Sequence, residues 1–175
     1  MTFFRIAGAL AAMAIATGAA SAQGGAKPTD PQIAHIAYTA GVIDIEAAKQ
    51  ALKKSKNKEV RAFADNMVKD HSAVNKQALA LVKKLKVTPQ DNPTSQALTK
   101  QAADKRAELA KLNGAAFDKA YVDNEVAYHK TVDNALETQL IPSAQNAELK
   151  SLLQTGLKIF QGHQQHAEHV ASELK

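Results

Sequence analysis

The chain has 175 residues, a formal net charge of +5 and no cysteine. The lack of cysteine excludes disulfides and thiolate ligands, so a bound metal ion must be held by nitrogen, oxygen or methionine sulfur. Aromatic residues make up only 5% of the chain, too few for the stacking platform of a nucleic-acid-binding protein, so we expect no nucleic-acid partner.

The first 22 residues have the pattern of a secretory signal peptide. Arg5 precedes an apolar run over residues 6–16, and Ala20-Ser21-Ala22 is typical of a cleavage site. A membrane anchor is the alternative interpretation, but the run is short for a bilayer span. We therefore predict cleavage near Ala22 and a periplasmic or secreted mature protein with no transmembrane segment.

The mature chain is predicted to consist of a short leader and one helical domain. Residues 23–30 are rich in glycine and form the flexible leader, in which Asp30 is expected to cap the first helix. Residues 31–175 have the length of a single domain. Its lysines are spread along the predicted helices, and we interpret them as the solvent-facing sides of those helices. The alternative is that they attract anionic envelope components weakly.

Apolar residues recur at helical spacing through the whole domain, and no alternating β pattern of useful length interrupts them. Five helices are expected, at residues 31–54, 57–86, 95–112, 114–140 and 144–175. Short connections between long helices favour antiparallel neighbours. The predicted fold is therefore an all-α, up-down four-helix bundle, with the helix at 95–112 added between the second and third core helices.

Titratable residues interrupt the apolar face of each core helix. They are Asp44 in the first, His71 in the second, Glu125 and His129 in the third, and His163 in the last, with His166 at the edge of that face. Burying such a group without a partner costs several kcal/mol. Because four helices each contribute at least one, we expect these side chains to meet inside the bundle.

The spacing of these residues supports a common layer. Glu125 and His129 lie four residues apart and His163 and His166 three apart, so each pair shares one side of its helix. The residues of the first three core helices lie near the helix middles, which are level in antiparallel neighbours. His163 lies about a turn beyond the middle of its helix, so helix spacing alone does not place it in the same layer.

Two interpretations of the layer follow. In the first, Asp44, His71, Glu125, His129, His163 and His166 bind a transition-metal ion such as zinc, copper or iron, for buffering, sensing or delivery. In the second, the layer is only a hydrogen-bond network that sets helix register in a non-catalytic envelope or stress-related protein. An enzyme would need a redox metal with an open coordination position. No nucleophile–base arrangement or phosphate loop is visible, and catalysis is left undecided.

Three segments carry a resemblance to a known family. Residues 60–75 (VRAFADNMVKDHSAVN), 115–129 (AAFDKAYVDNEVAYH) and 162–166 (GHQQH) resemble the domain of unknown function 4142 family. The resemblance implies an exported, ferritin-like four-helix domain, often labelled a membrane or outer-membrane protein, with no assigned activity. The residues that match the family pattern are Asp70, His71, Asn75, Phe117, Asp118, Tyr121, His129 and His163.

Three of the candidate ligands depart from that family pattern. Asp44 stands where the family usually has a glutamate, and its shorter side chain reaches less far into the bundle. Glu125 and His166 are not positions of the pattern, so a role for either would be particular to this chain.

Overall fold

The computed structural model describes residues 27–174, so the predicted signal peptide, its cleavage site and most of the leader lie outside the described residues. Within this range the chain is helical and contains no strand. The elements are α1 (Asp30–Lys54), α2 (Lys58–Leu85), α3 (Pro93–Ala110), α4 (Gly114–Ala135), the π-helix η1 (Leu136–Leu140), α5 (Ile141–Ser143) and α6 (Ala147–Glu173).

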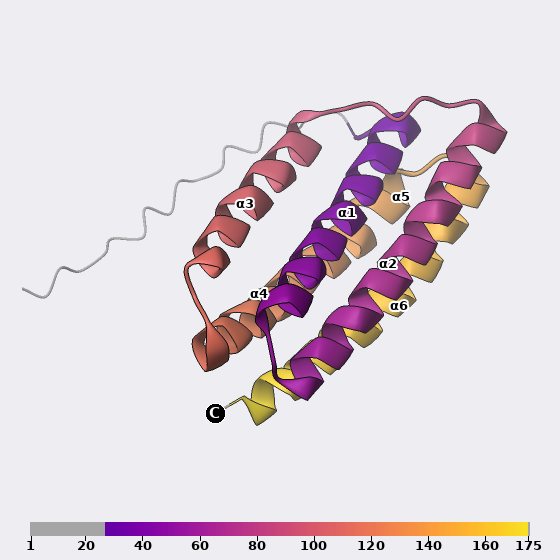
Figure 1. Cartoon of the computed structure of the whole chain (residues 1–175). Coiled ribbons are helices and arrows are strands. Elements are labelled where there is room, and N and C mark those ends of the chain that lie inside the picture. Colours follow the sequence, from indigo (N-terminus) through magenta and orange to yellow (C-terminus); the bar gives the residue numbers. More distant parts are fainter. Residues whose placement is uncertain (1–26, 175) are drawn as a thin grey trace, which may run out of the picture.

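The four long helices α1, α2, α4 and α6 form the bundle (Figure 1). The first two make one hairpin and the last two another, and the hairpins meet through α2 against α6 and α1 against α4. The shorter α3 lies outside this bundle, along α1. The predicted all-α fold with one added helix between the second and third core helices is confirmed, whereas its ferritin-like character stays a prediction.

The start of α1 corrects one sequence prediction. The N-cap is Thr29, whose backbone N–H donates to Gln32 Oε1 at 2.9 Å, and Asp30 is already the first helical residue. The Asp30 carboxylate instead accepts from the backbone N–H groups of Gln145 and Asn146, both at 2.8 Å. The Asp30 side chain, which was expected to cap its own helix, therefore binds the loop before α6 instead.

The other helix ends follow local sequence closely. Asn57, the first residue of the predicted range 57–86, caps α2 and accepts from two backbone N–H groups of the first turn. The α3 helix begins slightly earlier than predicted, at Pro93, because Asn92 supplies the cap. Gly114, with a φ of +55°, lies in the left-handed region between α3 and α4, a conformation that glycine adopts without strain.

The predicted break at residues 141–143 lies a few residues too early. The helix widens into the π turn of η1 and continues as α5 through Pro142, and the backbone becomes extended only at Ala144. A π turn shifts hydrogen bonds from the i−4 to the i−5 carbonyl, which accommodates a proline that has no N–H to donate. The last helix then begins at Ala147, capped by Asn146.

The core consists of two apolar clusters. One gathers around Phe63, Phe117 and Tyr121 and joins all four bundle helices with α3. The other gathers around Ile33, Leu140 and Leu153, near the start of α1 and the start of α6. On each bundle helix the titratable residues occur in sequence between the residues of one cluster and those of the other, so a polar layer separates two apolar halves.

Candidate metal centre

Five of the six predicted ligands lie in this polar layer. Each is buried, with the following exposed fractions: Asp44 3%, His71 2%, Glu125 1%, His129 1% and His163 6%. The residues come from α1, α2, α4, α4 and α6 in that order. The sequence expectation that the bundle helices aim titratable groups at one place agrees with this arrangement, and His163 does reach the level of the other two histidines.

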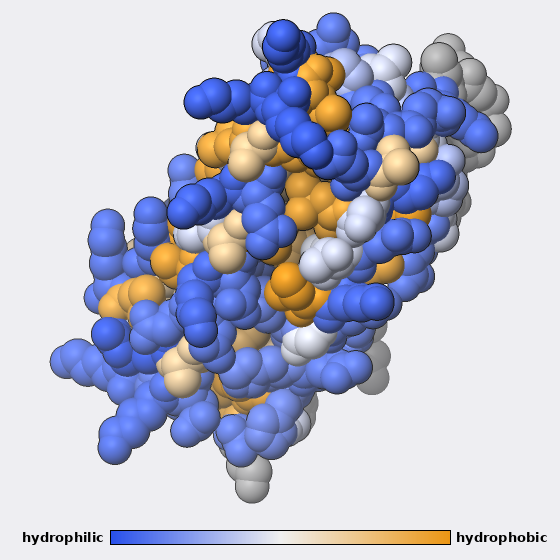
Figure 2. All heavy atoms as spheres, turned by 90° about the vertical axis from the view of Figure 1, so that its right-hand side faces the viewer, coloured by the Kyte–Doolittle hydropathy of each residue, from blue (hydrophilic) through white to orange (hydrophobic). Residues whose placement is uncertain are grey.

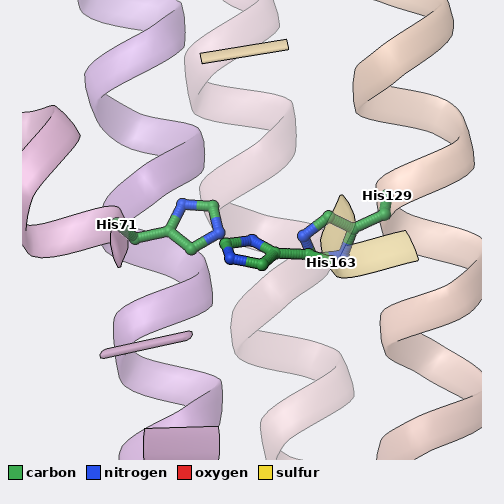
Figure 3. A group of neighbouring side chains, drawn as sticks. All are labelled: His71, His129 and His163. Atoms are coloured by element: carbon green, nitrogen blue, oxygen red, sulfur yellow. The ribbon is translucent and has the colours of Figure 1, made fainter. Parts of the chain in front are cut away.

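Three imidazoles converge from three helices (Figure 3). One ring nitrogen from each of His71, His129 and His163 lies within 4.8 Å of the others. The ring centroids are 5.1 to 5.8 Å apart. Nitrogens bound to one tetrahedral zinc ion are about 3.3 Å apart, so small side-chain rotations would bring all three to a common ion.

Hydrogen bonds orient two of these rings. His129 Nδ1 lies 2.9 Å from the backbone carbonyl oxygen of Glu125, and His163 Nε2 lies 3.1 Å from Asp70 Oδ2. Because each of these nitrogens faces an oxygen that only accepts, each must carry the ring proton. The other nitrogens, His129 Nε2 and His163 Nδ1, then carry a lone pair, and both are buried without a hydrogen-bond partner.

The third imidazole is held by packing. The His71 ring stacks on Phe160, with 4.6 Å between centroids and 8° between planes. Its Nε2 lies 3.5 Å from Asp44 Oδ2, and neither ring nitrogen makes a hydrogen bond to a described residue. The ring is therefore fixed in position, while both its nitrogens stay available.

A second group, of carboxylates, adjoins the imidazoles. Ligand atoms of Asp44, Glu125 and His129 also lie within 4.8 Å of one another, so His129 belongs to both groups. Glu125 Oε2 is buried without a hydrogen-bond partner and lies 3.8 Å from His129 Nδ1. The layer thus offers nitrogen donors and oxygen donors side by side.

Burial shifts the pKa of each of these five side chains away from its ordinary value. Burial, together with the neighbouring Glu125 charge, raises the pKa of Asp44 well above its ordinary value, and burial raises the pKa of Glu125 to about 8. Burial lowers the pKa of His71 and His163, and brings the pKa of His129 to about 4. Without a metal ion, neutral pH therefore leaves the imidazoles uncharged and keeps a proton on Glu125.

His166 does not join either group. Its half-buried ring meets Phe63 edge-on, with centroids 5.2 Å apart and an interplanar angle of 86°. It lies one turn beyond His163 toward the C-terminus, in the half of the bundle that the Phe63 cluster fills. The predicted assisting role of His166 therefore has no support in the geometry, because aromatic packing holds the ring away from the layer.

Two further carboxylates belong to the site's surroundings. The Asp70 side chain bonds His163 on α6 and not the adjacent His71. Asp133, one turn after His129, was missed; it is buried without a hydrogen-bond partner, and burial raises its pKa to about 6. Its place four residues after His129 was the available sequence signal.

Comparison with known proteins identifies the family. The family model described as Domain of unknown function (DUF4142) matches residues 15–170. The chain belongs to this family. No curated protein and no solved structure gives a significant match. Among the helices that the structure describes in this DUF4142 protein, none combines the length and apolarity needed to cross a bilayer.

Proposed function

We propose that this DUF4142 protein is an exported metal-binding protein that holds a transition-metal ion in the bundle interior. The ligands would be His129 Nε2, His163 Nδ1 and one nitrogen of His71. Asp44 or Glu125 would add a carboxylate oxygen. Export rests on the signal-peptide pattern of the first 22 residues.

One observation carries the proposal. Two histidines direct their N–H groups outward, to the Glu125 carbonyl and the Asp70 carboxylate, and leave an unshared electron pair pointing inward from a buried nitrogen. Histidines that bind metals typically have this arrangement, in which an outer oxygen fixes the tautomer and orients the ring.

The alternative of a purely structural hydrogen-bond layer fits less well. A layer that sets helix register stabilises the fold when its buried polar atoms are paired. Here the unpaired atoms include both nitrogens of His71, Nε2 of His129 and Oε2 of Glu125. Leaving a buried polar group unpaired costs about 1–3 kcal/mol, and a metal ion would give these atoms a common partner.

The donor set narrows the choice of metal. Three neutral imidazoles with a carboxylate suit zinc, copper(II) or iron(II), whereas magnesium and calcium prefer oxygen ligands throughout. Binding through Glu125 would release the proton that this carboxyl group holds at neutral pH, so affinity should rise with pH. Such a site would serve buffering, sensing or delivery of the ion.

The test is a titration of tag-free, chelator-treated protein with cobalt(II) and zinc. We expect saturable binding, with visible cobalt absorption typical of four or five ligands. The His71→Ala variant should bind at least 100-fold more weakly, and Asp70→Asn about 10- to 100-fold more weakly because it releases the outer contact of His163. His169→Ala, which removes an exposed histidine of α6, is the matched control. Equal weak binding by wild type and His71→Ala would reject the proposal.

A further inference from the structure

A large cavity lies beside the polar layer, in the half of the bundle around Ile33 and Leu140. Its volume is about 750 Å³, within the range of about 300–1,000 Å³ usual for small-molecule sites. It is bounded by the first half of α1, the second half of α2, the end of α4 with η1, and the first half of α6. On the face formed by α2 and α6, Figure 2 shows apolar side chains exposed between hydrophilic rims.

The walls of the cavity are apolar along its length. The α6 wall runs from Leu149 to Phe160, a rise of about 16 Å at 1.5 Å per residue. The adjacent wall includes Val74 and Ala78 of α2. Phe160 lines the cavity and also stacks on His71. None of the candidate ligands is a lining residue, so the cavity is a site of its own.

The polar residues of the cavity are unevenly distributed. Near the start of α1 the lining includes Lys27, Gln32 and Asn92. The far end, around Ala40 and Phe160, has only neutral polar groups, those of Asn75 and Thr131. Lys27 is the one charged residue among the lining residues that the structure describes, and no carboxylate lines the cavity. A ligand that complements these walls has an apolar chain and a negative group at one end.

We propose that the cavity binds a single-chain anionic lipid, such as a fatty acid. The acyl chain lies along the apolar α6 wall, with its end near Phe160, and the carboxylate lies at the rim near Lys27. Burial of apolar surface supplies most of the binding free energy at about 25 cal/mol per Å². The lysine sets the preference for a negative headgroup.

The test uses cis-parinaric acid, a fluorescent 18-carbon fatty acid, with the full mature chain treated with chelator. Because no metal is present, failure here is distinguishable from failure of the metal-binding proposal. We expect a fluorescence increase that saturates near one probe per chain, and displacement by palmitate. Hexadecyltrimethylammonium, which has the same chain length as palmitate but a cationic head, should compete at least 10-fold more weakly.

Two matched variants locate the binding. Ala78→Phe fills the cavity and should weaken probe binding at least 10-fold, whereas Ala80→Phe, on the exposed side of the same helix, should change it less than 2-fold. Lys27→Glu should weaken palmitate and strengthen the cationic competitor. Helix content and unfolding midpoint of each variant establish that it is folded.

Any of four results would overturn the proposal. The first is no saturable fluorescence change with wild-type protein. The second is equal binding by wild type and a folded Ala78→Phe variant. The third is equal competition by the anionic and cationic amphiphiles. If sedimentation instead shows a wild-type dimer that Ala78→Phe converts to monomer, a second copy of the chain covers this face and the lipid assignment fails.

Discussion

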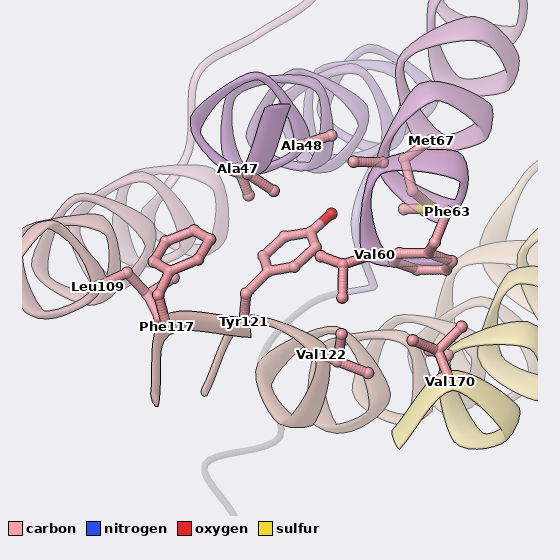
Figure 4. Close-up of a cluster of buried hydrophobic side chains, with 13 residues drawn as sticks. Ala47, Ala48, Val60, Phe63, Met67, Leu109, Phe117, Tyr121, Val122 and Val170 are labelled. Atoms are coloured by element: carbon pink, nitrogen blue, oxygen red, sulfur yellow. The ribbon is translucent and has the colours of Figure 1, made fainter. Parts of the chain in front are cut away.

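The two halves of the bundle, on either side of the polar layer, are built differently. In one half Phe63, Phe117 and Tyr121 interdigitate with no exposed surface (Figure 4). In the other half, Leu81 and Phe160 are only partly buried and the helices enclose the cavity. The difference indicates that the filled half supplies most of the packing energy, while the hollow half keeps space open.

The difference has a source in the sequence of α2. Its first half presents large side chains, Phe63 and Met67, to the core, and its last buried residue is Asn75. Beyond Asn75 the inward positions include the small Ala78. A small residue at an inward position leaves space that neighbouring side chains fill only if the backbones move closer, and here they do not.

The largest expected effect is the loss of an aromatic ring from the filled half. Phe63→Ala should lower the free energy of unfolding by about 3–5 kcal/mol, since it leaves a cavity in a fully packed cluster. Phe160→Ala, the matched change beside the existing cavity, should cost about 1–2 kcal/mol. Urea denaturation of the chelator-treated proteins measures both. Equal losses would contradict the comparison between the halves.

Enlarging a buried side chain should destabilise the filled half more than the half with the cavity. Ala48 in the filled half has no exposed surface, so Ala48→Phe should destabilise the protein by about 2–3 kcal/mol through overpacking. Ala78→Phe, which extends into the cavity, should leave the unfolding midpoint unchanged or raise it. Thermal unfolding of the two variants measures the contrast, and a large loss in both would mean that the cavity cannot accept a ring.

The polar layer between the halves should make stability depend on pH in the absence of metal. The pKa of Glu125 is raised to about 8 in the fold, so between its unfolded value near 4.5 and pH 8 the folded chain keeps a proton that the unfolded chain releases. Glu125 alone should therefore lower stability by about 2 kcal/mol from pH 6.5 to 8. The unfolded histidines, with an ordinary pKa of 6.5, are still partly protonated at the start of this window, so their loss of protons offsets part of the fall.

Glu125→Gln tests the origin of this fall. It removes the titrating group and keeps the side-chain shape, so the variant should lose less stability than wild type between pH 6.5 and 8. The imidazoles act with the opposite sign: the stability that they provide as neutral groups is lost as pH falls through their unfolded pKa of 6.5 toward the His129 pKa of about 4. An unchanged slope in the variant would assign the fall to another group.

The smallest effect is expected from removing a single imidazole. In the metal-free protein, His71→Leu should raise the free energy of unfolding by about 1 kcal/mol, because it replaces two unpaired buried nitrogens with apolar atoms of similar volume. The same variant should no longer be stabilised by added zinc. A loss of stability without metal would show that His71 serves the fold itself.

The sequence predicted much of the fold because helix formation and burial have short-range signatures. The 3–4 spacing marked the bundle helices, Asn57 marked the start of α2, and the interruptions of the apolar faces marked Asp44, His71, Glu125, His129 and His163 before their positions were known. A buried titratable group is costly enough to stand out in an apolar stripe, which is why these residues could be identified without coordinates.

Only the tertiary structure decided which groups face each other. It paired Asp70 with His163 rather than with His71, directed Asp30 to the loop before α6, and placed the His166 ring against Phe63. It also continued the helix through Pro142 and left a cavity beside Phe160. Such outcomes depend on the rotation and separation of helices distant in sequence, whereas periodicity reports only which side of its own helix a residue occupies.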